Sequence, residues 1–441
     1  MLAEKSKIER WPDYLYTLAL VVWVAIIVLT GTYLRIRAED QSMSVDWLVA
    51  ARLGACLMGG AIGYILMRLN GRIGTSAIIL FSFVGAALLS VTFSAYRELV
   101  FGYWLLLAGA ALLTTGIVYH STRPADLIKV EKIWLVVMLL ILLKDALTAL
   151  LMPHMQADYG VGGPTRLGMG VTHANALGFG AAITFWLTFR QARRKWLLLT
   201  VRFILLAIVL LAWSRTAMLS LAFAGLVRFW FKQGLKGEKY LLFRLAVVLA
   251  LIGLVIFIGL SLAFDATITR EALQAFNRGQ DLQTVTSLTG RTEIWPVVVK
   301  KIFAGPQYFI FGHGYGVSRL IINEGYLIPA FYASNAHNTF MEILLTMGSF
   351  GTVFFVALAL YVLMWLLRYR HFATVFGSEF TLRAITTITI ILIHANTESV
   401  MGTKIGPVTL LFFFYVLALD RAKSFLTLQE KKPPRQSVVK A

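Results

Sequence analysis

Residues 337–351 read HNTFMEILLTMGSFG, and this stretch marks the point where a long polar segment runs back into an apolar helix. The polar segment, from Asp265 to Ala336, is the only long hydrophilic stretch in an otherwise apolar chain. His337 therefore stands where water, lipid headgroups and a packed helix meet. Because imidazole titrates near neutral pH, we expect any chemistry at the membrane surface to take place at this junction.

The chain as a whole is too apolar for an ordinary soluble protein. Of its 441 residues, 58% are hydrophobic, and its mean hydropathy is +0.74. Several uncharged runs approach the roughly 20 residues that a helix needs to cross a bilayer. The first, Tyr14 to Leu34, is too long for a signal-peptide core and is followed by no cleavage site, so we expect it to remain as a span. The sequence predicts an all-α polytopic membrane protein.

The apolar runs predict about twelve transmembrane helices. They lie at residues 14–35, 45–68, 73–95, 98–118, 131–152, 170–189, 196–213, 215–232, 240–264, 337–368, 380–397 and 405–421. The chain then divides into helices 1–9 (1–264), a large, partly helical outer loop (265–336), helices 10–12 (337–421) and a cytoplasmic tail (422–441).

The outer loop and the tail carry further signals. Residues 292–303 have the pattern of a helix that runs along the membrane surface. A loop of about 70 residues is far longer than an ordinary connection, which favours a functional role. The tail is expected to be disordered, and its Lys431, Lys432 and Arg435 to lie near the anionic headgroups of membrane lipids.

The distribution of charge orients the helices. When both termini are placed in the cytoplasm, the inner segments carry nearly all of the net charge of +19, including the clusters at 190–195 and 228–244. This is the asymmetry of the positive-inside rule, and it places the loop at 265–336 outside. A membrane topology signal thus explains the basic composition better than nucleic-acid binding does. The single cysteine, Cys56, excludes an intramolecular disulfide and a cysteine metal cage.

Two arginines interrupt apolar or helical patterns on the outer side. Arg215 lies in WSRTAML, from Trp213, at the end of a predicted span. A charge at this depth favours a functional role, and the alternative is an arginine that reaches to the headgroups. Arg291 follows Gly290 and opens a predicted helix, where its guanidinium and the backbone N–H groups suit a phosphate. The alternative for Arg291 is a surface salt bridge.

Two roles fit His337. The ring can accept a proton from a hydroxyl group as a general base, or it can donate a hydrogen bond at the start of the helix. Gly348 and Gly351 are three residues apart, so we expect them to share a helix face and permit close contact with another helix.

The other polar residues of the outer links and the spans indicate a function less specifically. His173 and His313 suit packing or substrate contact, since no HExxH or comparable pair indicates a metal. His394, Asn396 and Glu398 suit either a hydrated cavity or a structural network. Lys144 and Asp145 suit packing against polar partners, and because adjacent helical positions do not face each other, they need not pair with each other. No GxxxxGK[ST] loop indicates ATP hydrolysis, and no Asp-x-Asp pair lies in the outer links, so we expect neither cofactor nor metal.

The spacing from His337 to Gly351 resembles the motif His-[Asn/Ser/Gln]-x9-Gly-x-x-[Gly/Thr/Tyr] of the bacterial O-antigen ligase (WaaL) family. Arg215 and Leu219 are similar to that family's second motif, and Gly290-Arg291 resembles the wider O-antigen ligase/polymerase superfamily. The resemblance implies a GT-C type glycosyltransferase in the inner membrane of Gram-negative bacteria, with several spans, both termini cytoplasmic and a periplasmic active site.

The resemblance also implies substrates and residue roles. The family transfers polysaccharide from undecaprenyl pyrophosphate to lipid A core. By position, His337 is expected to deprotonate the acceptor hydroxyl, and Arg215 and Arg291 to hold the pyrophosphate. Arginine forks can balance the charge of this leaving group, which implies metal-independent, inverting transfer without a cofactor. Possible further substrate contacts are His313, Arg319, Asn338 and His173.

Other functions share these features. An O-antigen polymerase or a protein oligosaccharyltransferase uses the same kind of donor, and the motifs do not separate the acceptors. A lipid-linked glycan transporter is a more remote alternative, in which the histidine and the arginines only bind.

Overall fold

The computed structural model is helical throughout the part of the chain that it describes. The described residues are 11–31, 47–71, 73–151, 167, 174–189, 195–233, 291–324, 335–366, 369–402 and 405–430. Seven helices within these ranges are long and apolar enough to cross a membrane. The prediction of a multi-pass, all-helical membrane protein is therefore confirmed at this level.

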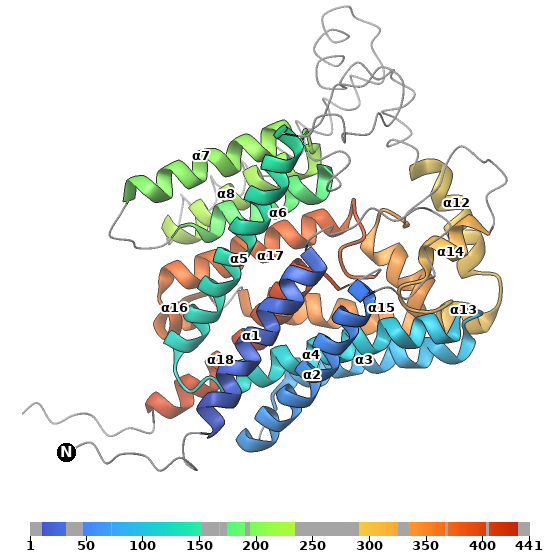
Figure 1. The fold of residues 1–441 in the computed structure, drawn as a ribbon, viewed down its shortest axis with the longest axis horizontal. Coiled ribbons are helices and arrows are strands. Elements are labelled where there is room, and N and C mark those ends of the chain that lie inside the picture. The colour runs from blue at the N-terminus through green and yellow to red at the C-terminus, as the bar shows by residue number, and fades with distance from the viewer. Residues whose placement is uncertain are drawn as a thin grey trace, which may run out of the picture.

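The first half of the chain forms two groups of helices (Figure 1). Five candidate spans come first, namely α1 (Trp11–Gly31), α2 (Trp47–Asn70), α3 (Thr75–Phe93), α4 (Arg97–His120) and α5 (Pro124–Leu151). A separate group follows, which comprises α6 (Ala174–Leu187), α7 (Lys195–Leu211) and α8 (Arg215–Gln233).

The second half of the chain closes the structure. Three short helices gather at one end of α15, namely α12 (Arg291–Ile302), α13 (Pro306–Phe311) and α14 (Ser318–Asn323). The remaining helices are α15 (Thr339–Leu366), α16 (Tyr369–Phe376), α17 (Ser378–Ala395) and α18 (Pro407–Glu430), of which α15 and α17 are candidate spans.

The predicted helices agree with this arrangement. A helix stands at every predicted place that falls within the described residues, including the surface helix predicted at 292–303. The helix predicted at 240–264 lies outside them. The end predicted at residue 421 is wrong, because α18 continues to Glu430. Phe425 explains the extension, since its buried ring packs edge-on against Phe376 at 6.2 Å between centroids. Residues 431–441 lie outside the description.

Glycines bring α2 and α4 into backbone contact. A Cβ atom on Gly63 would lie 2.3 Å from the carbonyl oxygen of Leu112, and one on Gly116 would lie 2.5 Å from that of Gly63. Helices in a membrane associate through such close packing, because the hydrophobic effect does not drive them together there. These two helices make the most extensive contact of any helix pair in the described part of the chain.

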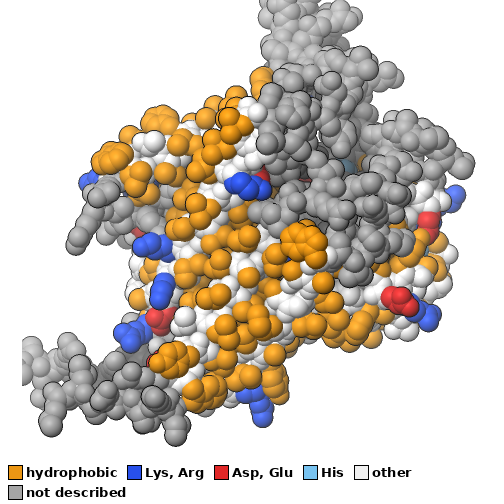
Figure 2. Space-filling model, viewed as in Figure 1, with side chains coloured by type: hydrophobic (Ala, Val, Ile, Leu, Met, Phe, Trp, Pro, Cys, Tyr) orange, Lys and Arg blue, Asp and Glu red, His pale blue; other side chains and the backbone are white. Residues whose placement is uncertain are grey.

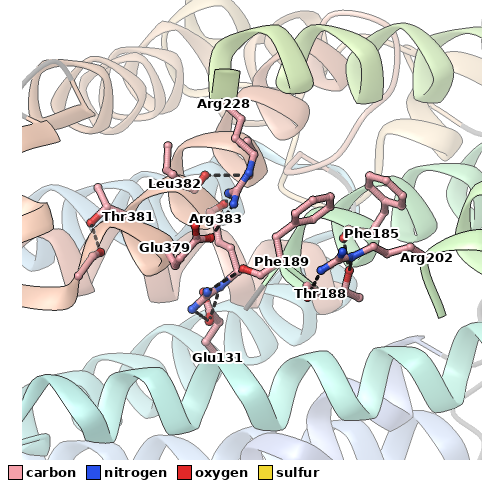
Figure 3. Close-up of polar contacts among 12 residues, drawn as sticks. Glu131, Phe185, Thr188, Phe189, Arg202, Arg228, Glu379, Thr381, Leu382 and Arg383 are labelled. Carbon is pink, nitrogen blue, oxygen red and sulfur yellow. Dashed lines mark hydrogen bonds and ion pairs between the residues drawn. The ribbon is translucent and has the colours of Figure 1, made fainter. Parts of the chain in front are cut away.

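Buried charges join the two groups of helices (Figure 3). Arg383 of α17 donates to Glu131 of α5 from Nε at 2.9 Å and from Nη2 at 2.6 Å, and Nη1 donates to the carbonyl of Phe189 at 3.1 Å. Arg228 of α8 pairs with Glu379 at 2.6 Å. A charge in a low-dielectric interior is tolerated only with such partners. These side chains therefore hold α5, α8 and α17 together.

Two adjacent residues of α5, which need not pair by helix geometry alone, do pair in the structure. Lys144 and Asp145 form an ion pair at 2.6 Å, although they are adjacent on α5. Asp145 is buried and Lys144 is exposed, and the long lysine side chain can fold back to a neighbouring carboxylate where the surroundings offer little water.

A break in α15 determines how the short helices dock. Gly348 has φ +66° and ψ −169°, which is not helical. A continuous helix satisfies each carbonyl with the N–H group four residues on, and a break disturbs this pattern. At the break, the amides of His313 and Gly314 donate to the carbonyls of Leu345 and Thr346, both at 2.9 Å. The glycine-rich turn after α13 is thus fixed to the backbone of α15.

The expectation that Gly348 and Gly351 share one helix face is wrong, because the helix is broken at Gly348. Close helix contact is confirmed at Gly348, where a Cβ atom would lie 2.2 Å from the carbonyl oxygen of Ile310 in α13. A Cβ atom on Gly351 would instead meet Met347 of α15 itself at 2.4 Å. The two glycines form the break and its first turn.

The replacement Gly348→Ala tests this role of the break. We expect it to lower the free energy of unfolding by about 1–3 kcal/mol, because only glycine readily adopts this backbone region and the added methyl group meets α13. The matched control is Gly85→Ala in α3, where nothing lies within 4 Å of the new methyl group. The melting temperature in detergent is the measurement. Equal melting temperatures for the two variants would show that the break is not under this constraint.

Candidate functional site

His337 forms a pair with a carboxylate from the turn after α17. Its Nδ1 atom lies 3.0 Å from Oε2 of Glu398, and both side chains are partly buried. An ionised carboxylate only accepts hydrogen bonds, so Nδ1 carries the proton and Nε2 presents its lone pair. None of the described residues bonds Nε2. The ring is therefore fixed on one side and available for proton transfer on the other.

The backbone of His337 is strained and held in place by side chains. Its φ of +50° is in the left-handed region, which non-glycine residues seldom adopt. Asn335 Oδ1 accepts the N–H group of His337 at 2.8 Å, and Glu342 Oε2 accepts that of Ala336 at 2.8 Å. Such strain persists only where the surroundings enforce it, and it concentrates at functional sites.

The start of α15 is fixed beside the same pair. Asn338 caps the helix, since its Oδ1 accepts the N–H groups of Phe340 at 2.9 Å and Met341 at 3.1 Å. Its Nδ2 donates to the carbonyl of Asn396 at 3.1 Å. Thr339 donates to the carbonyl of Glu398 at 2.7 Å. Asn338 thus caps the start of α15 and also bonds to the turn that carries Glu398.

A second carboxylate supports the arrangement from inside. Glu342 is fully buried, and besides the amide of Ala336 its Oε2 accepts the hydroxyl of Ser399 at 3.3 Å. It therefore connects the residue before His337 to the residue after Glu398. Gly402 packs against it, since a Cβ atom there would lie 2.4 Å from its Cγ atom.

The helix that begins with Arg291 is joined to this site. Trp295 of α12 donates from Nε1 to the carbonyl of Ala336 at 3.1 Å. Arg291 is the first described position of α12 and lies four residues, or about one helical turn, before Trp295. The side chain of Arg291 lies outside the description. The start of α12 is thus about one helical turn from Trp295, and Trp295 contacts Ala336, the residue before His337.

α8, the helix that begins with Arg215, is joined to the site through α6. Asn175 of α6 donates from Nδ2 to Oε1 of Glu398 at 2.7 Å. One turn further on, Gly178 packs against the start of α8, where a Cβ atom would lie 3.1 Å from the Cβ atom of Ser214. Arg215 is half-buried at the first position of α8. Trp213 stands two residues before it, and Trp213 and His337 are the two non-glycine residues with positive φ in the described part of the chain.

Two of the other predicted substrate contacts, His313 and Arg319, lie among the described residues. His313 is buried, stacks on Tyr308 at 4.0 Å between centroids, and donates from Nε2 to the carbonyl of Lys301 at 2.9 Å. Burial lowers the pKa of His313, although the hydrogen bond to Lys301 raises it. These contacts hold the ring in the turn, and its role as a substrate contact stays a prediction. Arg319 is exposed on α14, and His173 lies outside the described residues.

The short helices are also fastened to the spans by a polar contact. The hydroxyl of Tyr96, just before α4, donates to Glu324, which also pairs with Lys301 at 3.3 Å. The hydrogen bond to Glu324 and, to a lesser degree, burial raise the pKa of Tyr96 to about 12. Tyr96 is thus a stable donor that ties the end of α14 to the start of α4.

Comparison with known families bears on the segment that contains these motifs. Residues 200–356 match the model of a family described as O-antigen ligase. This match supports membership of the O-antigen ligase/polymerase superfamily. No curated protein matches it. The matched segment includes Arg215, Arg291 and His337, whereas Glu398 and Asn175 lie outside it.

The partners of His337 were only partly predictable from the sequence. Glu398 belonged to a polar group for which a structural network was one interpretation, and the structure shows that network. Sequence reasoning did not pair Glu398 with His337, and it missed Asn175, Trp295 and Glu342. The available sequence signal for Glu342 was its position about one helical turn after the His-Asn motif. No group of three histidine, cysteine or acidic side chains suited to a metal gathers among the described residues.

Two replacements of Asn338 separate its capping of α15 from its bond to Asn396. We expect Asn338→Ala to lower the free energy of unfolding by about 0.5–2 kcal/mol, because the N–H groups of Phe340 and Met341 lose their acceptor. Asn338→Ser keeps a capping oxygen and loses only the bond to Asn396, so its melting temperature should stay near that of the unchanged protein. Equal losses in both variants would contradict the capping role.

Proposed function

We propose that this superfamily member is an O-antigen ligase. It transfers polysaccharide from undecaprenyl pyrophosphate to lipid A core, at the periplasmic face of the bacterial inner membrane. The reaction is independent of metal and inverts the anomeric carbon. The observation that carries the proposal is the pairing of His337 with Glu398, which leaves Nε2 of a strained and well-fixed residue available as a general base.

The proton transfer follows from this geometry. Nε2 of His337 accepts the proton of the acceptor hydroxyl while the hydroxyl oxygen attacks the anomeric carbon of the donor sugar. The imidazolium that forms lies beside the Glu398 carboxylate, 3.0 Å from Nδ1, which balances its charge. A general base contributes about 10² to 10⁴ in rate, so the reaction depends strongly on this ring.

The leaving group is assigned to the two arginines. The bond between the anomeric carbon and the pyrophosphate oxygen breaks as the new bond forms, and undecaprenyl pyrophosphate departs with the electron pair. Arg215 is at the first turn of α8, and Arg291 is at the first described turn of α12, where helix N-termini favour anions. Contacts through α6 and Trp295 connect both helix starts to the surroundings of His337. In-line displacement between base and arginines inverts the carbon.

A transfer assay with purified protein tests the proposal. The protein is incubated with lipid-linked O-antigen and either lipid A core or a second lipid-linked repeat, and products are separated by electrophoresis. We expect glycan on lipid A core, with His337→Gln at least about 10²-fold slower because its amide does not accept a proton as imidazole does. The melting temperature of the variant serves as a control for folding.

Three outcomes would contradict parts of this proposal. Growth of polymer on the lipid carrier without transfer to lipid A core would identify a polymerase. No product with either acceptor, together with binding of the donor, would favour a transporter. Full transfer by a folded His337→Gln variant would remove the general base from His337 but leave the ligase activity intact.

A further inference from the structure

An exposed apolar patch covers the corner between α12 and α13. It consists of Val299, Phe303, Phe309 and Ile310, all of which are exposed. Phe303 and Phe309 stack on each other at 5.4 Å between centroids, and the side chain of Phe303 is 67% exposed. This patch belongs to the segment between the candidate spans rather than to a span. An exposed cluster of this kind marks a contact with a partner or with lipid.

The break in α15 fixes the level of this patch relative to the bilayer. From Ser349 to Leu366 the helix is about 27 Å long, at about 1.5 Å per residue. This is close to the hydrocarbon thickness of about 30 Å. The candidate span extends from Thr339 to Met364, and we assign the crossing of the hydrocarbon region to its part after the break, so that Gly348 lies near the boundary. Because the backbone of Ile310 contacts Gly348, the patch lies at the same level.

The neighbouring span gives the same level independently. α3 is about 28 Å long by the same rise per residue, so Phe93, its last residue, also lies near the boundary. The ring of Phe311 in α13 stacks on Phe93 at 4.6 Å between centroids. α13 is thus held at one height by two spans.

The apolar surface continues from the patch onto α15. Phe350 and Val353 follow the break directly and are exposed on the candidate span, where their surroundings in a membrane are acyl chains. Hydrophobic side chains cover much of the coloured part of the face seen in Figure 2, and many of the charged ones lie toward its edges. Lys300, beside Val299, is exposed and suits a lipid phosphate group.

We propose that the α12–α13 corner inserts its apolar patch into the bilayer leaflet nearest His337, so that acyl chains are its occupant. The continuity of the patch with the lipid-facing surface of α15 favours lipid over a second protein. The corner then anchors the turn at 312–314 to the membrane, and with it the start of α15. This inference does not depend on the reaction that the site performs.

Fluorescence quenching in nanodiscs tests the insertion. Cys56 is the only cysteine and is 1% exposed, so a new surface cysteine can be labelled selectively, with the unchanged protein as the background control. Phe303→Cys and Phe309→Cys carry an environment-sensitive fluorophore. Val353→Cys on the span is the lipid reference, and Arg319→Cys on α14 is the aqueous reference. Each nanodisc holds one protein molecule, and the quenchers are doxyl-labelled lipid and aqueous iodide.

We expect doxyl lipid to quench positions 303 and 309 as strongly as position 353, and iodide to quench them several-fold less than position 319. Quenching of both positions by iodide but not by lipid would overturn the proposal. Protection from both quenchers would also overturn it, because the patch would then be covered by protein. The quenching is read without substrate, so its result is separate from that of the transfer assay.

Discussion

A single carboxylate, that of Glu398, connects the parts of this protein that carry its motif residues into one site. One oxygen faces the ring of His337 at 3.0 Å, and the other accepts the amide of Asn175 in α6 at 2.7 Å. α6 in turn packs against the start of α8, where Arg215 lies. Removing this carboxylate would take away the acceptor that both donors now share, and the ring of His337 could then rotate. The candidate site therefore depends on a residue that lies far along the chain from both arginines.

A backbone constraint supports this side-chain network. The break at Gly348 allows the turn at 312–314 to bond directly to carbonyls of α15, and this fixes the short helices on the first turns of that helix. Trp295 then holds the carbonyl of Ala336, while Glu342 holds its amide. His337 is consequently strained by contacts on both sides of it. A residue held in this way does not need to reorganise when it accepts a proton.

The sequence predicted the helices well, because uncharged runs near the thickness of a bilayer have few alternative structures. It also predicted roles for His337, Arg215 and Arg291 from their resemblance to family motifs. It did not reveal that Glu398 faces His337, because their contact depends on how α15 and α17 pack. The nature of Gly348 was misjudged for a related reason, since i, i+3 spacing implies a shared face only in an unbroken helix. The extension of α18 depends on the packing of Phe425 against Phe376.

The most direct test of the account is the single-turnover rate of glycan transfer by Glu398→Gln, alone and combined with Asn175→Asp. Glutamine offers one acceptor oxygen where two donors now bond, so we expect a loss of about 10-fold or more, within the range that a general base contributes. The aspartate introduced at position 175 can accept the glutamine amide and restore the orientation of the ring, so the double variant should recover part of the rate. A folded Glu398→Gln variant that transfers glycan at the unchanged rate would contradict the account.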